Sequence, residues 1–247
     1  TTGPGGCAAG AGAGAMTRRY PGRLIAAPNP PLGRTLLAVK LDETAQVHGH
    51  AHPLYTNVWA SGVEEPSACR HMQRFDLILG VPTWTFKLGG ATLLKRIWME
   101  HGRNTTYVQY TLARNGPAID LAFRLLVNDR DYHEMTHGAP RDLEVTSEHK
   151  RLEVCAPRTG HRLRGTCDSP HQAGDWKIRY TTCRDFHLSI EAARGFSHLE
   201  DHYIVGTCEH ALRPGDALTF VLSADGDKPP AMRSALARAE KRSNARL

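Results

Sequence analysis

The sequence has no long apolar run, no closely spaced pair of cysteines and few aromatic residues. Phe, Trp and Tyr together make up 7% of the 247 residues, while 40% are hydrophobic and 23% are charged. A stretch of about 18 apolar residues, the minimum for a membrane-spanning helix, is missing. The 23 glycines and 15 prolines are too few for a low-complexity or collagen-like chain. These features predict a globular protein that does not span a membrane.

The cysteines are scattered and none occurs in a C-x-x-C pair, which argues against a structural zinc site and a disulfide scaffold. Near the start, residues 5–16 are mostly Gly and Ala, and the cations Arg18 and Arg19 follow them. A secretory signal has the opposite order, with positive charge before a Leu-like stretch. We therefore expect a cytoplasmic protein whose thiols are reduced. The six cysteines are Cys7, Cys69, Cys155, Cys167, Cys183 and Cys208.

Positive charge is concentrated at the C-terminal end. The net charge is +6, yet residues 228–247 hold six of the 31 basic residues and one of the 25 acids. The rest of the chain is therefore nearly neutral. Nucleic-acid binding needs clustered cations that face a lattice of phosphates. A neutral body with a basic tail makes a nucleic-acid-binding protein the less favoured class.

Alternation of apolar and polar residues with a period of two recurs along the chain, as expected for strands with two different faces. Turn signals such as Gly89-Gly90 and Asn115-Gly116-Pro117 separate the runs. This pattern predicts an all-β protein, a large antiparallel sandwich. From about Glu134 to Gly174 the sequence is irregular, and only Arg151–Ala156 is predicted to be a strand. The clearest alternating runs are residues 75–79, 84–88, 108–112, 119–125 and 218–222.

One segment has helical spacing. After Pro229-Pro230, the apolar residues Met232, Leu236 and Ala239 recur at intervals of four and three. A lone amphipathic helix gains most of its stability by packing its apolar stripe. We expect a helix within residues 228–247 that lacks a complete packing partner in this chain and frays.

Two other patterns were weighed as ligand sites. His48, His50 and His52 alternate and resemble a metal site, but Gly49 and Pro53 favour a His-rich hairpin tip. The glycine-rich segment 3–14 lacks the preceding strand and the following helix of a dinucleotide fingerprint. We expect neither a metal nor a cofactor.

Two clusters combine cations with aromatic rings and are the best candidates for a site. Guanidinium forks and carboxylates can grip vicinal hydroxyls, and aromatic rings can stack on a sugar. Salt bridges that merely pin loops are an equally good explanation for either cluster. Acid pairs for glycoside hydrolysis are less convincing, although Asp129 and Asp131 would share one face of a strand. The candidate residues are Arg18, Arg19 and Tyr20 in one cluster, and Arg130, Asp131, Tyr132 and His133 in the other.

Read in order, these clusters and their neighbours resemble the N-terminal domain of the bacterial and archaeal type of glycogen debranching enzyme (amylo-α-1,6-glucosidase). Looser matches occur at Trp176, Leu199-Glu200-Asp201 and Leu212-Arg213-Pro214-Gly215. Pro21 stands where the family usually has His, and Cys7 where it has an aromatic residue. The stretches that carry the resemblance are Gly3-Pro4-Gly5-Gly6, Thr17-Arg18-Arg19-Tyr20-Pro21-Gly22, Pro31-Leu32-Gly33-Arg34, Lys40-Leu41-Asp42-Glu43-Thr44, Thr56-Asn57, Lys95-Arg96-Ile97, Asn104-Thr105 and Arg130-Asp131-Tyr132-His133.

The resemblance implies a β-supersandwich like the N-terminal domain of glucoamylase-type hydrolases, over residues 1–227, with a basic helical linker over residues 228–247. It further implies an (α/α)6 barrel that carries the catalytic carboxylates and hydrolyses α-1,6 branch linkages of glycogen. This chain lacks that barrel and is expected to be inactive alone. The two clusters would gather at one edge, facing the barrel and the branched glucan. The main alternative is a stand-alone carbohydrate-binding module.

Overall fold

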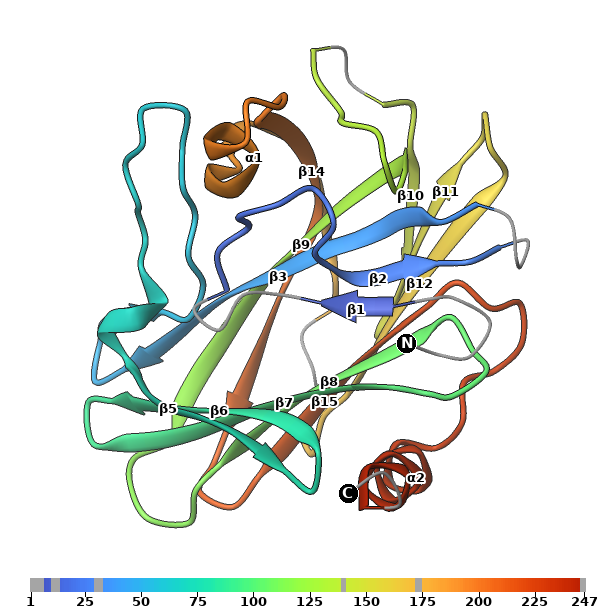
Figure 1. Cartoon of the computed structure of the whole chain (residues 1–247). Helices are drawn as coiled ribbons and strands as arrows, with labels where there is room; N and C mark the ends of the chain where they lie inside the picture. Colours follow the sequence, from blue (N-terminus) through green and yellow to red (C-terminus); the bar gives the residue numbers. More distant parts are fainter. Residues whose placement is uncertain (1–6, 10–13, 29–32, 139–140, 172–174, 245–247) are drawn as a thin grey trace.

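A computed structural model describes residues 7–9, 14–28, 33–138, 141–171 and 175–244. The described residues form two antiparallel sheets that face each other (Figure 1). In spatial order, the seven-stranded sheet contains β1 (Cys7–Ala9), β2 (Gly22–Ala26), β3 (Thr35–Val47), β9 (Ile119–Asp131), β14 (Leu199–Leu212) and β13 (Lys177–His187), and β4 (His50–Pro53) pairs with β3. The eight-stranded sheet contains β10 (Glu144–Glu148), β11 (Arg151–Ala156), β12 (His161–Asp168), β15 (Ala217–Ser223), β8 (Thr105–Leu112), β7 (Ala91–Met99), β6 (Val81–Leu88) and β5 (Met72–Ile78).

The predicted all-β sandwich is confirmed, and the alternating runs are its strands. Along β9, Leu121, Phe123 and Leu125 are buried and join the core between the sheets. The polar residue Asp120, between the buried residues Ile119 and Leu121, is exposed. The strand predicted at Arg151–Ala156 has the observed bounds of β11. Period-two alternation therefore located several strands and the core face of β9, although the apolar residues of the run 75–79 are exposed.

The expectation that the surrounding segment is irregular was wrong. Strand β10 precedes β11 and pairs with it, and β12 follows and also pairs with it. In β10 the residues Glu144, Thr146 and Glu148 are exposed, so this edge strand buries too little apolar surface to show an alternating pattern. In β12 the apolar face consists largely of Leu163, Gly165 and Cys167, which is a weak signal.

Charged residues also lie inside the sandwich. Glu43 of β3 is fully buried and is contacted by the ammonium group of Lys95 and, at 2.5 Å, by the hydroxyl of Tyr110. Burial lowers the pKa of Lys95 to about 8 although Glu43 opposes the shift, and burial raises the pKa of Tyr110. Two of the family-like motifs, the one with Glu43 and the one with Lys95, thus meet across the core.

The C-terminal helix α2 (Met232–Asn244) packs on the outer face of the eight-stranded sheet (Figure 1). Ala235 and Ala239 are buried against Trp98 and Tyr107, whose rings stack with centroids 5.3 Å apart. The Tyr107 hydroxyl donates to the carbonyl of Pro230 at 2.8 Å, just before the helix. The expectation that the helix lacks a packing partner was therefore wrong, because strands β7 and β8 are apolar on their outer face as well. The expectation that the helix frays stays a prediction.

The outer face of the seven-stranded sheet is covered by loops and by the short helix α1 (Ser189–Ala193). A 3₁₀ turn, Ala68–Arg70, ends one of these loops. Within the described ranges, none of the helices combines the length and the apolar character that crossing a bilayer requires. The cover packs on a small second core made of Met16, Ile25, Leu36, Val39, Leu126, Phe186, Leu188 and Ile204.

Candidate functional site

The structure brings the two candidate clusters together. The loop with Arg18, Arg19 and Tyr20 precedes β2, and Tyr132 and His133 follow the end of β9. The ring of Tyr20 lies 4.8 Å from that of Tyr132 and 5.9 Å from that of His133, centroid to centroid. The clusters therefore form one surface on the loop-covered side of the seven-stranded sheet, which we call the aromatic–cation cluster. Whether this surface binds a glucan stays a prediction.

Arg130 holds this surface from beneath. Its side chain is fully buried. Its Nε and Nη2 donate to the Glu200 carboxylate, and Nη2 also donates to the Arg19 carbonyl at 2.5 Å. Nη1 donates to the carbonyls of Asp131 at 3.0 Å and Tyr132 at 3.3 Å. A guanidinium has only five N–H donors, and these contacts use all of them. Arg130 therefore pins both loops and has no donor left for a ligand.

Two buried carboxylates complete the support. Glu200, at the start of β14, is fully buried, and burial raises its pKa although Arg130 opposes the shift. Glu191 of α1 accepts the Arg19 backbone N–H at 3.2 Å and its Nη2 at 3.4 Å. Both carboxylates are committed to arginines of the cluster. They pin loops and are not positioned as a free acid and base.

The exposed part of the cluster alternates rings and cations. Arg34 lies over the Tyr132 ring at 5.5 Å, and Arg19 lies over the ring of Phe196 at 5.6 Å. Phe196 is 51% exposed, and Arg18 is also exposed. Planar rings beside guanidinium groups can stack on a sugar and donate to its hydroxyls. Sequence reasoning had not placed Arg34 and Phe196 here, although Arg34 belongs to one of the family-like motifs.

Asp131 has a local role. One of its carboxylate oxygens accepts the backbone N–H of His133 at 2.8 Å and so fixes the turn after β9. The neighbouring Asp129 is buried and contacts His161 at 2.7 Å and the hydroxyl of Thr159 at 2.8 Å. The two aspartates therefore serve different partners and do not form a catalytic pair.

Another family-like motif forms a second buried polar network on the same sheet. The ammonium group of Lys40 contacts Asp42 at 2.9 Å, the Asn57 side-chain oxygen at 2.7 Å and the Thr56 carbonyl at 2.9 Å. Arg124 contacts Asp42 at 3.3 Å. This network attaches the loop after β4 to β3, so these motif residues are structural.

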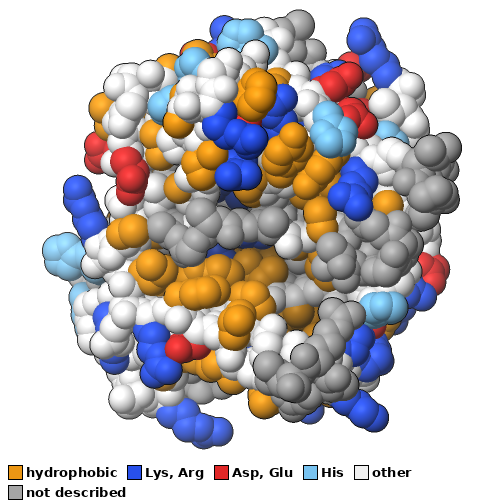
Figure 2. Space-filling view, in the orientation of Figure 1, with side chains coloured by type: hydrophobic (Ala, Val, Ile, Leu, Met, Phe, Trp, Pro, Cys, Tyr) orange, Lys and Arg blue, Asp and Glu red, His pale blue; other side chains and the backbone are white. Residues whose placement is uncertain are grey.

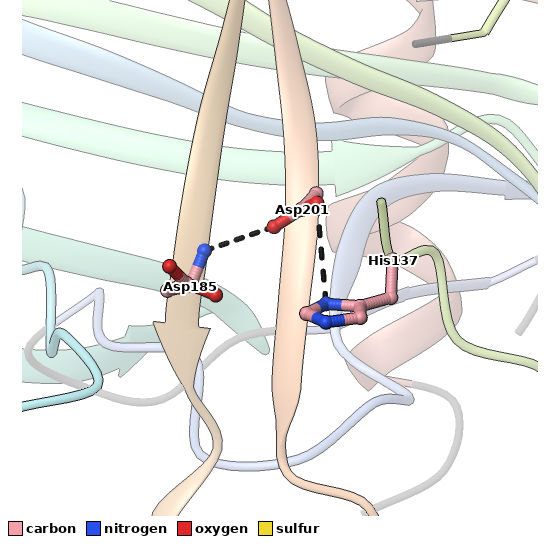
Figure 3. Close-up of side chains that lie close together, drawn as sticks. All are labelled: His137, Asp185 and Asp201. Carbon is pink, nitrogen blue, oxygen red and sulfur yellow. Dashed lines mark hydrogen bonds and ion pairs between the residues drawn. The ribbon is translucent and has the colours of Figure 1, made fainter. Parts of the chain in front are cut away.

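Figure 3 shows a group of side chains that could hold a metal ion. His137, Asp185 and Asp201 offer ligand atoms that lie within 4.8 Å of one another. However, the buried Asp201 carboxylate already accepts the backbone N–H of Asp185 and that of Gly138, both at 2.9 Å. The Asp201 carboxylate thus links the loop at Gly138 to strand β13, and we assign no metal to the group.

The predicted hairpin tip at the alternating histidines is confirmed. Strands β3 and β4 pair up to Val47 and His50, and both residues of the turn, His48 and Gly49, have positive φ. The rings of His52 and His71 meet edge to face, with centroids 4.8 Å apart and an interplanar angle of 83°. The motif residues 3–6 and Pro31-Leu32, and most of the glycine-rich segment, lie outside the described residues.

A groove of about 410 Å³ lies away from the cluster, between β1–β2 and β5–β7. Its lining includes Arg23, Phe75, Trp84 and Met99. Figure 2 shows hydrophobic side chains gathered along this seam between the sheets. Arg23 and, from α2, Arg242 and Ser243 line the groove beside these apolar side chains. The aromatic–cation cluster is the better candidate for binding a hydroxylated ligand because it presents exposed rings beside guanidinium groups.

Two solved structures were compared with the chain. One, described as a kojibiose phosphorylase from the human microbiome, is 10% identical with a TM-score of 0.40 over 86% of this chain and 26% of that one. The other, a bacterial glucoamylase in complex with acarbose, is 9% identical with a TM-score of 0.36 over 84% of this chain and 29% of that one. The chain thus spans less than a third of the length of either. No curated protein matches it.

A family model described as glycogen debranching enzyme N terminal matches residues 1–219. The match includes both parts of the aromatic–cation cluster and the buried networks around Lys40 and Glu43. It confirms the resemblance read from the motifs. The chain belongs to the family of glycogen debranching enzyme N-terminal domains.

Proposed function

We propose that this chain is the non-catalytic N-terminal domain of a glycogen debranching enzyme of the amylo-α-1,6-glucosidase type. A separate (α/α)6 domain would supply the acid and base that hydrolyse α-1,6 branch linkages. Family membership supports this proposal, and so does the state of the carboxylates. Glu191 and Glu200 are buried in ion pairs with Arg19 and Arg130, so the cluster offers no free carboxylate pair from these residues.

The observation that carries the glucan role is the aromatic–cation cluster. Tyr20, Tyr132 and His133 are held side by side on a support that is itself saturated with hydrogen bonds. Sites work best when the contacting groups stand on a rigid second layer. We propose that this surface faces the catalytic barrel and completes its site for a branched glucan.

The domain boundary and the location follow from the same proposal. Residues 1–227 would form the sandwich and residues 228–247 the start of the connection, with α2 docked on its own sheet. Six free cysteines are consistent with a cytoplasmic enzyme.

The test compares two neighbouring arginines in the full-length enzyme. Arg18→Ala removes an exposed cation and should lower turnover of branched glucan without changing Tm. Arg19→Ala breaks the contact with Glu191 and should lower both the turnover of branched glucan and the Tm. Arg179→Ala, an exposed arginine on β13, is the matched control and should change neither. Unchanged turnover with Arg18→Ala and with Tyr20→Ala would contradict a glucan role for the cluster.

The alternative, a stand-alone carbohydrate-binding module, makes a different prediction for the isolated chain. Such a module should bind immobilised glycogen as tightly as any longer form does. The proposed domain should bind it weakly alone, because the barrel supplies most of the site. Affinity electrophoresis in gels that contain glycogen distinguishes the two.

A further inference from the structure

The terminal strands of the two sheets differ in how they avoid pairing with other chains. Exposed sheet edges attract foreign strands, and proteins blunt them with short strands or charges. Strand β1 is three residues long. Strand β10 exposes Glu144 and Glu148, and β13 exposes Lys177 and Arg179. Strand β5 carries Arg74 and Asp76, but these two charges contact each other at 2.7 Å and the rest of its C-terminal half is apolar.

The unprotected part of β5 is apolar. Phe75 is 47% exposed, Leu77 66%, Ile78 43%, and Leu79 of the following turn 48%. Phe75 and Leu77 lie on one face of β5 on either side of Asp76, and Ile78 and Leu79, where the strand ends, are exposed as well. Exposed apolar patches of this kind mark interaction surfaces.

The backbone of β5 also presents free hydrogen-bonding groups. Ile78 pairs with Val81 across a two-residue turn in which Leu79 and Gly80 both have positive φ. The pair that closes such a hairpin exchanges two hydrogen bonds, and pairs then alternate along an antiparallel ladder. Phe75, opposite Trp84, is therefore in a pair that exchanges none, so its N–H and C=O point away from β6.

The sequence of this edge is self-complementary around Phe75. In an antiparallel pair of two β5 strands centred on Phe75, Arg74 of one copy lies directly opposite Asp76 of the other. The same contact occurs twice because the axis is twofold. Within one chain, Arg74 and Asp76 already contact each other at 2.7 Å, so the four charges would form one closed cluster. Oppositely charged cross-strand neighbours favour this register.

We propose that β5 pairs with β5 of a second copy of this chain, joining two eight-stranded sheets into one continuous sheet. The two Phe75 backbones exchange hydrogen bonds at the centre, and Phe75 and Leu77 of each copy cover those of the other. This goes beyond the proposed glucan function and uses a different part of the molecule. A bulge between Met72 and Arg74 limits the paired length. The interface is therefore small, and the dimer should dissociate on dilution.

Sedimentation velocity of the 247-residue chain, from low micromolar to several hundred micromolar, tests the proposal. The wild type should shift from monomer to dimer. Leu77→Lys places a cation on the exposed patch and should weaken the dimer about tenfold or more, because Leu77 is the diagonal neighbour of Phe75 of the other copy and this apolar contact is lost. Ile178→Lys, at a 50% exposed apolar residue of β13, is the matched control and should leave the dimer intact.

Charge variants test the register. The variant Arg74→Asp has acids at both positions 74 and 76, and the variant Asp76→Arg has cations at both. Like charges then face each other across the strand pair, so each variant alone should be monomeric. An equimolar mixture should form a heterodimer, because every acid then faces a cation. A wild type that stays monomeric at all concentrations would overturn the proposal. Dimers that survive Leu77→Lys, or single charge variants that dimerise like the wild type, would also overturn it.

Discussion

The two sheets of the sandwich cover their outer faces in different ways. On the eight-stranded sheet, α2 lays Ala235 and Ala239 on Trp98 and Tyr107, with ion pairs at its margin. On the seven-stranded sheet, separate loops are held together by the fully buried pair Arg130–Glu200. An apolar cover needs only an apolar stripe of the helix that fits the apolar surface of the sheet. A polar cover needs every donor and acceptor matched, and in return it fixes the geometry of the loops above it.

The candidate functional surface lies on the polar cover. Arg130 donates to backbone carbonyls of both loops, so a displacement of one loop shifts the guanidinium group that also holds the other. The apolar cover presents no comparable constellation among the described residues of α2. The buried ion pair therefore contributes to the position of the loops more than to the stability of the fold.

The largest effect is expected where the polar cover is broken. Arg130→Ala leaves Glu200 buried without its partner, and removing one member of a buried pair costs about 3–5 kcal/mol. Urea denaturation should show the loss in the free energy of unfolding. Hydrogen exchange should rise most in the loops around Tyr20 and Tyr132, while amides of α2 change only with global stability.

The double variant Arg130→Met/Glu200→Leu serves as the control for that experiment. It removes both charges and should recover much of the lost stability. The loops should still exchange faster than in the wild type, because no group then binds their carbonyls. Loops that stay protected in the double variant would show that the arginine does not position them.

Acid should loosen the polar cover before the apolar one. His202 is fully buried beneath the loops, and burial, with Arg130 adding to the effect, holds its pKa well below the ordinary value of 6.5. The unfolded chain therefore binds more protons as the pH falls below 6.5. Stability should decrease by about 1.4 kcal/mol per pH unit in that range.

The variant His202→Gln cannot titrate and should reduce this acid dependence, as measured by thermal unfolding between pH 7 and pH 5. The part that remains is expected from His210, because burial lowers its pKa to about 4. The exposed His101 provides the matched control, since His101→Gln should leave the slope unchanged. An equally steep slope in His202→Gln would assign the acid sensitivity to other groups.

A smaller effect is expected at the base of the polar cover. A Cβ atom on Gly22 would lie 2.4 Å from a methyl carbon of Leu36 and 3.2 Å from the carbonyl oxygen of Ala38. Gly22→Ala should therefore cost about 1–3 kcal/mol through overpacking. Gly226→Ala, with no atom within 4 Å of the added methyl group, should be neutral within about 0.5 kcal/mol.

The smallest effect is expected at the margin of the apolar cover. Arg96 and Glu240 are 2.7 Å apart, and both side chains are partly exposed. A double-mutant cycle with Arg96→Ala and Glu240→Ala should give a coupling of about 0.2–1 kcal/mol. A coupling as large as the Arg130→Ala effect would remove the distinction between the two covers.

Sequence reasoning was most successful where one physical rule acts alone. Period-two alternation located β9 and β15 because each has one face in the core. It failed for β10, whose side chains are mostly polar, and it gave no partner for α2. The partner of α2 is the outer face of β7 and β8, where Trp98 and Tyr107 are buried. Tyr107 lies just outside the alternating run 108–112, so the pattern marked only the inner face of β8.

The candidate site was predicted in part. The adjacency of the two polar clusters was expected and is observed. The roles within them depend on which way each side chain points at the end of β9, which a sequence does not fix. The side chain of Arg130 points inward and holds both loops by hydrogen bonds. The side chain of Asp131 points outward and fixes the turn after β9. Arg34 joins the site only through the pairing of β3 with β9, which is set by the tertiary fold.

The five hydrogen bonds of Arg130 also have a kinetic meaning. Its acceptors belong to residues 19, 131, 132 and 200. The full set of hydrogen bonds therefore forms only after chain segments 111 and 70 residues away in sequence have packed beside Arg130. Contacts of such long range form late and slow the folding of antiparallel β proteins. The aromatic–cation cluster should therefore be among the last surfaces to mature. A nascent chain would form its sheets before this surface, and a damaged chain would lose this surface before its sheets. Binding of a ligand at the cluster would therefore require a completely folded domain.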